Sequence, residues 1–181
     1  MIMVNYKIGK VNFEMREGDI AQQEDIEAVV NAANAELRIG GGVAGALHSA
    51  AGPELEQECR PLAPIFPGEA VITGAYNLPN RYVIHCLGPI YGVNQPESKL
   101  LANCYKNALD LAEENEITSI AFPSISTGAF GYPLKEAIPI AVDTLLHKIP
   151  ELKSVKQLVM VLYSSNDFQA YKNYLDKKTN K

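Results

Sequence analysis

The chain has 181 residues, of which 47% are hydrophobic and 20% are charged. This size and composition predict one globular domain over residues 1–181, and they exclude a disordered, collagen-like or coiled-coil protein. The net charge of −5 argues against a broad basic surface for duplex DNA or RNA, because such binding rests on clustered lysine and arginine. A small anionic ligand remains compatible with this charge, since backbone N–H groups and a helix dipole can hold it.

Targeting and metal-binding signals are missing from the sequence. No apolar run approaches the roughly 20 residues of a membrane span. The N-terminus lacks a basic segment followed by an apolar one, so we expect no signal peptide. The three cysteines and three histidines are scattered and form no CxxC pair, which argues against a zinc site. We therefore expect a cytoplasmic monomer with reduced thiols, no metal, no cofactor and no membrane partner.

Strand and helix patterns alternate along the chain. A helix that begins at Val43 is predicted to continue through Pro53 toward Cys59 with a kink. Strands are predicted at residues 6–8, 11–15, 28–33, 70–73, 82–87, 119–123 and 157–163, further helices at 101–112, 134–146 and 168–175, and a frayed polar tail at 177–181. Continuous apolar strands between helices imply an α/β fold with a mostly parallel sheet covered on both faces. Ligands of such sheets bind at the carboxyl ends of the strands, here near Ala33, Ile125 and Tyr163.

A glycine-rich segment follows the strand at 28–33. The strand end carries Asn31 and Asn34, and residues 40–42 are three consecutive glycines that lead into a helix. Glycines let the backbone approach a ligand closely, and the unpaired N–H groups of a helix N-terminus favour phosphate. The segment is neither a Walker loop nor a dinucleotide-binding GxGxxG in its usual place. A flexible loop with asparagines as turn formers is the alternative interpretation.

A second loop of small residues occupies positions 124–133, directly after another strand. Its glycines also expose backbone N–H groups, so the two loops could clamp a diphosphate from both sides. Phe130 lies between Ala129 and Gly131, which predicts a ring presented to a ligand; the alternative is that Phe130 and Tyr132 are ordinary core aromatics.

Two further strand ends carry side chains suited to a nucleobase. Asp19 could accept a hydrogen bond from an exocyclic amine, and Tyr163 could stack on the ring. A solvated carboxylate and a core tyrosine are the respective alternatives.

Together these segments resemble the macrodomain family. Macrodomains carry Gly-Asp-Ile, Val-Asn-Ala-Ala-Asn, a glycine-rich loop and Ile-Ser-Thr-Gly-x-Phe-Gly-Tyr-Pro. This chain has the same segments, in the same order, at residues 18–20, 30–34, 40–42 and 125–133. Segments between them resemble the MacroD-type branch, and the resemblance covers most of the chain, from about Gly18 to about Tyr171.

The resemblance implies a three-layer α/β/α fold on a mixed, mostly parallel sheet, and a cleft for ADP-ribose or an ADP-ribosylated protein. Asp19 would bind the adenine amino group, Tyr163 would cover the base, and Asn34 and Phe130 would contact the distal ribose. The ligand-binding residues that it implies are Asp19, Ile20, Asn34, Gly41, Gly42, Val43, Ser126, Thr127, Gly128, Ala129, Phe130 and Tyr163.

One position departs from the MacroD-type pattern. Ala44 stands where those loops usually carry an aspartate, which is proposed to activate water or position the distal ribose. The segment Gly-Gly-Gly-Val-Ala-Gly-Ala-Leu is instead similar to coronavirus macrodomains, which remove ADP-ribose from acidic side chains without it. We therefore expect metal-independent removal of mono-ADP-ribose from Asp or Glu esters, or deacetylation of O-acetyl-ADP-ribose, with Asn34, Gly42 and Phe130 as catalytic residues. A non-catalytic ADP-ribose reader is the alternative, and we expect His48 on the helix surface rather than in the cleft.

Overall fold

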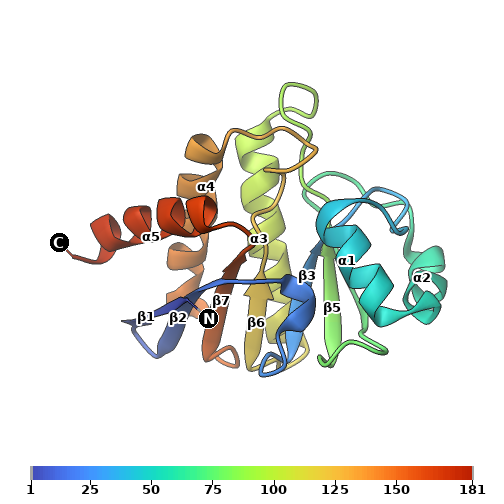
Figure 1. The fold of residues 1–181 in the computed structure, drawn as a ribbon, viewed down its shortest axis with the longest axis horizontal. Coiled ribbons are helices and arrows are strands. Elements are labelled where there is room, and N and C mark those ends of the chain that lie inside the picture. Colours follow the sequence, from blue (N-terminus) through green and yellow to red (C-terminus); the bar gives the residue numbers. More distant parts are fainter. Residues whose placement is uncertain (1, 181) are drawn as a thin grey trace.

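The computed structural model of the protein describes residues 2–180 and contains one seven-stranded sheet between two layers of helices (Figure 1). The strands are β1 (Met3–Ile8), β2 (Val11–Glu17), β3 (Ala28–Ala32), β4 (Ala70–Gly74), β5 (Tyr82–Cys86), β6 (Ser119–Phe122) and β7 (Gln157–Leu162). The helices are α1 (Gly42–Ala51), α2 (Pro53–Cys59), α3 (Glu97–Glu114), α4 (Leu134–Lys148) and α5 (Ser165–Thr179), with short 3-10 turns that include η1 (Ile20–Gln22).

The sheet is mixed and mostly parallel, as predicted. Its strand order is β1-β2-β7-β6-β3-β5-β4. The five inner strands are parallel to one another, and only the edge strands β1 and β4 run antiparallel to their neighbours. The carboxyl ends of β2, β3, β5, β6 and β7 therefore meet at one edge of the sheet.

Two hydrophobic clusters lie on opposite faces of the sheet, which explains the continuous apolar strands. Alternate residues of one strand enter different clusters: Val29 packs with α1 and α2, whereas Ala28 and Val30 pack with α3, α4 and α5. Each inner strand is buried on both sides, so the predicted three-layer α/β/α arrangement is confirmed. None of the helices in residues 2–180 is long and apolar enough to cross a membrane.

The structure differs from the predicted helices at two places. The segment from residue 43 to Cys59 is two helices rather than one kinked helix, because Gly52 has a φ of 91° and ends α1. Pro53 then occupies the first turn of α2, where its missing N–H has no helical partner to lose. At the other end of the chain, α5 continues to Thr179, so helix covers part of the predicted frayed tail; Lys181 lies outside the described residues.

Candidate functional site

A cleft lies along the edge of the sheet where the five parallel strands end. It consists of two adjoining cavities of about 490 Å³ and 270 Å³. We call them the Asp19 cavity and the Asn34 cavity after a residue at the far end of each. Gly42, Val43, Ser124 and Gly128 line both cavities, so the loops that precede α1 and follow β6 form the waist of one continuous cleft.

All twelve ligand-binding residues implied by the sequence line this cleft. Those of the Asp19 cavity are Asp19, Ile20, Gly42, Val43, Thr127, Gly128 and Tyr163. Those of the Asn34 cavity are Asn34, Gly41, Gly42, Val43, Ser126, Gly128, Ala129 and Phe130. The fold thus brings together segments from four different strand ends, although their individual roles remain predictions.

The N-terminus of α1 forms one wall of the waist. Gly42 is the first residue of the helix and has a φ of 55°, a conformation that glycine adopts without strain. Gly45 donates the first backbone hydrogen bond of this turn, to the carbonyl oxygen of Gly41 at 3.2 Å. Within residues 2–180 the N–H groups of positions 42–44 have no protein acceptor. This wall therefore presents unpaired donors and the positive end of the helix dipole.

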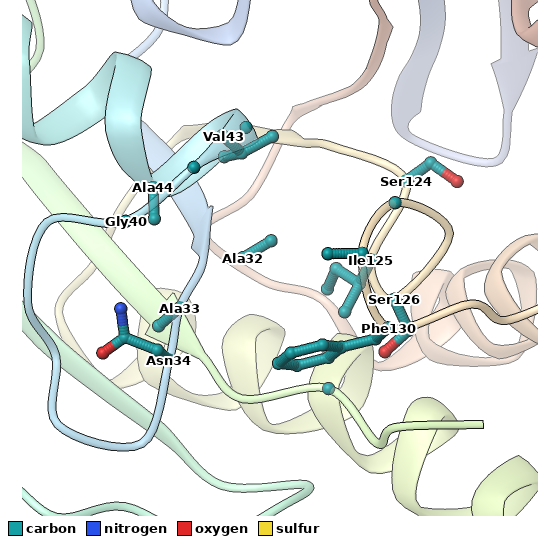
Figure 2. A pocket seen from close by; sticks show the side chains of 15 residues that line it. Ala32, Ala33, Asn34, Gly40, Val43, Ala44, Ser124, Ile125, Ser126 and Phe130 are labelled. Atoms are coloured by element: carbon teal, nitrogen blue, oxygen red, sulfur yellow. The ribbon is translucent and has the colours of Figure 1, made fainter. Parts of the chain in front are cut away.

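The loop of residues 124–133, which we call loop 2, forms the opposite wall (Figure 2). Its backbone turns at Ser126, which has a φ of 68° and whose carbonyl accepts a hydrogen bond from the Tyr132 N–H at 2.9 Å. The N–H groups of residues 126–130 find no acceptor in the described part of the chain. Residues from both sets of free donors thus line the same cleft, an arrangement that suits an oxyanion-rich ligand.

Two buried tyrosines form hydrogen bonds to loop 2. The Tyr105 hydroxyl accepts from the Ile125 N–H at 3.1 Å, and the Tyr171 hydroxyl lies 2.7 Å from Ser124 Oγ. Thr127 Oγ1 donates to the Ser124 carbonyl oxygen at 3.1 Å. Burial raises the pKa of Tyr171 to about 12 and that of Tyr105 well above its usual range, so both hydroxyls stay neutral. These contacts fix the shape of the loop before any ligand arrives.

Asn34 lines the Asn34 cavity, and its amide is turned toward the loop that leads to Gly40, where it is fixed by hydrogen bonds (Figure 2). Its Nδ2 donates to the Arg38 carbonyl at 2.8 Å, and its Oδ1 accepts from the Arg38 N–H at 3.0 Å. One N–H and one lone pair of the amide remain for a ligand. Phe130 lines the same cavity and is half-buried there, and the contact of its ring with a ligand stays a prediction, whereas Tyr132 is a core residue that packs edge-on against Tyr91.

The far end of the Asp19 cavity combines a carboxylate, an aliphatic side chain and an aromatic ring. Asp19 Oδ1 accepts from the Ala21 N–H at 2.8 Å and so caps η1. Ile20 is buried beside it, and Tyr163 is 86% exposed. The core-tyrosine interpretation of Tyr163 is therefore wrong, because β7 ends one residue earlier and leaves the ring outside both hydrophobic clusters.

His48 is neither on the helix surface nor in the cleft. It is buried against the interior and its ring lies 6.3 Å from that of His85. The prediction of a surface histidine is wrong, because position 48 falls on the face of α1 that packs on the sheet. His85 contacts Thr73 Oγ1 at 2.9 Å and Asn31 Nδ2 at 3.1 Å. Asn31 is thus part of the buried structure behind the strand and does not line either cavity.

Ala44 is buried and lines the Asn34 cavity, so the side chain at this position faces the ligand space. An aspartate at position 44 would point into the same cavity. No His, Cys or carboxylate side chain other than Asp19 and Asp167 lines either cavity within the described residues, and residues 2–180 contain no group of three such side chains placed to bind a metal ion.

Gly88, which none of the sequence motifs indicated, also lines the Asn34 cavity. A Cβ atom at this position would lie 2.1 Å from Ser126 Oγ and 2.7 Å from Ile125 Cγ2, so only glycine lets loop 2 approach. The sequence could have indicated Gly88 as a site residue, because it comes two residues after the end of β5, at the same sheet edge as the other loops of the cleft.

Comparisons with known proteins agree with this geometry. Residues 30–141 match a family model described as Macro domain. The chain is 45% identical over 151 residues to a macro domain-containing protein of Chlorobaculum tepidum, which covers 83% of this chain and 88% of that protein. It is 44% identical over 170 residues to the ADP-ribose glycohydrolase MACROD2 of Xenopus laevis, covering 92% of this chain and 40% of the relative.

Two solved structures resemble the whole chain or most of it. An Oceanobacillus iheyensis macrodomain with ADP has a TM-score of 0.95 at 38% identity, covering 99% of this chain and 97% of the other. A Trypanosoma brucei macrodomain in complex with ADP-ribose has a TM-score of 0.83 at 34% identity, covering 90% and 66%.

Proposed function

This chain belongs to the macrodomain family, and we propose that it binds ADP-ribose in the cleft and hydrolyses mono-ADP-ribose esters of protein Asp or Glu side chains. The observation that carries the proposal is the presence of two sets of free backbone donors along the cleft, at positions 42–44 and 126–130. Among residues 2–180, no lysine or arginine lines either cavity. A diphosphate would therefore be held by backbone donors and by the α1 dipole, which suits a chain with a net charge of −5.

The two ends of the cleft match the two ends of ADP-ribose. The adenine would lie in the Asp19 cavity, with its amino group donating to Asp19 and its ring between Ile20 and Tyr163. The distal ribose would lie in the Asn34 cavity, with Phe130 against its face. Its hydroxyls would be bound by the N–H and the lone pair of the Asn34 amide that are not bonded to Arg38. The bound ribose would then be oriented by groups that are already fixed, which lowers the entropic cost of reaching the reactive geometry.

Hydrolysis in this cleft would rely on positioning and on the substrate itself. Water attacks C1″ of the distal ribose, the bond from C1″ to the acceptor carboxylate breaks, and the carboxylate leaves as an anion. The proton released by the water passes to a phosphate oxygen of the substrate and then to solvent. The positive charge that develops on the ribose lies beside the diphosphate, which stabilises it. Deacetylation of O-acetyl-ADP-ribose would place an ester in the same cavity.

Ala44 supports a second candidate function, a reader of ADP-ribosylated proteins without turnover. The position lines the cavity, yet its methyl group cannot take a proton from water. Under this alternative the cleft binds the same ligand, and only the chemical step is missing. The fixed amide of Asn34 favours the enzyme, because a reader does not require an oriented attack.

The test is the loss of label from a mono-ADP-ribosylated acceptor over an hour, with wild type and Asn34→Ala side by side. We expect slow release from Glu or Asp esters and little from arginine or serine linkages, whose leaving groups are poorer. Asn34→Ala is expected to reduce release to background. Equal, background-level loss in both proteins, together with tight ADP-ribose binding by wild type, would make this chain a reader.

A further inference from the structure

A buried polar network lies directly behind the Asp19 carboxylate. Gln23 follows η1 and is only 3% exposed. Its Nε2 donates to the backbone carbonyl of Asp19 at 2.7 Å, and its Oε1 accepts from Arg16 Nη1 at 2.9 Å. Both functional groups of this amide are therefore committed, one to β2 and one to the residue proposed to bind adenine.

Arg16 anchors the network inside the sheet. Its guanidinium is buried, donates to both carboxylate oxygens of Asp25 at 2.8 and 2.6 Å, and also contacts the buried Glu14. The same guanidinium lowers the pKa of Asp25. The buried pair of Arg16 and Glu14 contributes little net stability, because desolvation offsets the attraction of the two charges, and the Asp25 side chain is 57% exposed. What such a cluster fixes is geometry, here the path of the chain from Gly18 to Asp25.

Asp19 depends on that path for the direction of its side chain. The carboxylate is held at Oδ1 by the Ala21 N–H, which leaves Oδ2 as the oxygen without a protein donor in residues 2–180. The backbone carbonyl of Asp19 accepts hydrogen bonds from Gln23 Nε2 and, at 3.0 Å, from the Gln22 N–H. These two bonds restrict rotation of the Asp19 backbone and so limit the directions that its side chain can take. The free oxygen then faces the cavity at a set angle.

We propose that Gln23, held by Arg16, is a positioning residue that makes the cleft selective for a 6-amino purine. The proposal rests on the proposed function, since it takes the base to lie against Asp19. A misdirected carboxylate would still permit stacking on Tyr163 and binding of the diphosphate. Loss of Gln23 should therefore reduce discrimination between bases more than it reduces binding as such.

The experiment compares the dissociation constants of ADP-ribose and inosine diphosphate ribose, whose base carries a carbonyl oxygen in place of the amino group. Wild type is expected to prefer ADP-ribose by about 10- to 100-fold, the range for one hydrogen bond to a charged group. Gln23→Leu removes both contacts of the amide. Gln23→Glu keeps an acceptor for Arg16 and removes only the donor to Asp19. Both variants are expected to reduce the preference at least fivefold.

Two further variants separate positioning from stability. Thr73→Val removes a buried 2.9 Å contact to His85 on another strand and is expected to lower the melting temperature while the preference stays within twofold of wild type. Asp19→Ala is expected to abolish the preference, and adding Gln23→Leu to it should change the preference no further. This non-additivity is the signature of one residue acting through the other.

The outcomes distinguish the two proposals. A wild type that binds neither ligand overturns the proposed function and this inference with it. A wild type that binds both equally overturns the inference and leaves ADP-ribose binding intact. A wild type that discriminates, with both Gln23 variants folded and equally selective, overturns the inference alone. If Gln23→Leu does not fold, Gln23→Glu, which retains the bond to Arg16, decides the matter.

Discussion

Replacing Gly45 by alanine tests how closely the glycine segment packs on α1. Gly45 lies in the first turn of the helix, and a Cβ atom there would lie 2.4 Å from the carbonyl oxygen of Gly40. Ordinary contacts begin near 3.4 Å, so the segment must move by about 1 Å, which is enough to break a hydrogen bond to a charged ligand worth about 1.5–3 kcal/mol. Gly40 in turn lies against the Asn34 amide, since its own Cβ would be 3.2 Å from Nδ2.

The expected result is a separation of binding from stability. Alanine is the better helix former by about 0.5–1 kcal/mol, which offsets part of the strain, so the melting temperature should change little. The affinity for ADP-ribose, measured by calorimetry, should fall about 10- to 100-fold. Ser49→Ala, at an exposed position of the same helix, is the matched control and should bind as wild type does. A Gly45→Ala affinity within threefold of wild type would refute the reasoning.

Gly88→Ala should both weaken ADP-ribose binding and destabilise the fold by about 1–3 kcal/mol in denaturant titrations, because its Cβ would overlap Ser126 Oγ; unchanged values would show that loop 2 moves freely. Ala44→Asp should speed ester hydrolysis at least about tenfold by supplying a base, whereas Ala44→Asn should not. Equal rates for the two variants would show that a carboxylate at position 44 does not act as a base. Burial lowers the pKa of His85 to about 3 from 6.5, so the folded protein binds fewer protons than the unfolded chain between these values. Stability should therefore fall as the pH falls from 6.5, by up to about 1.4 kcal/mol per pH unit, and His85→Gln should flatten that slope in denaturant titrations at pH 7 and 4.5.

Much of the fold could be predicted because strands buried on both faces of the sheet are continuous apolar runs in the sequence. Residues 28–32 and 157–162 read as apolar runs since alternate side chains enter separate clusters. The break between α1 and α2 was harder to predict. It depends on the backbone angle of Gly52, and a helix with a proline kink produces the same apolar spacing.

The parts of the candidate site that bind through backbone N–H groups could be predicted from the sequence. Glycine-rich segments that follow strands indicate turns with exposed N–H groups, so Gly42 and loop 2 could be placed at one edge of the sheet. Composition could not decide which aromatic side chain is exposed: Tyr163, directly after β7, is 86% exposed, whereas Tyr132, at the end of loop 2, is 4% exposed. The difference arises from a tertiary contact, the packing of Tyr132 on Tyr91.

Residues whose role depends on a partner distant in the sequence could not be found in this way. Gly88 matters because Ser126 lies against it, and Gln23 matters because Arg16 and Asp19 lie on either side of it. His48 could be placed only once the face of α1 that packs on the sheet was known.

The most direct test of the central claim is a calorimetric titration of ADP-ribose into wild type and Gly42→Val. Gly42 lines both cavities, has a positive φ and has open space where a Cβ would stand. A valine there would strain the first turn of α1 and place its methyl groups in the waist of the cleft. We predict one binding site per chain for wild type and no detectable heat for the variant. Wild type that shows no heat at millimolar ligand, or a variant that binds as tightly as wild type, would contradict the assignment of this cleft to ADP-ribose.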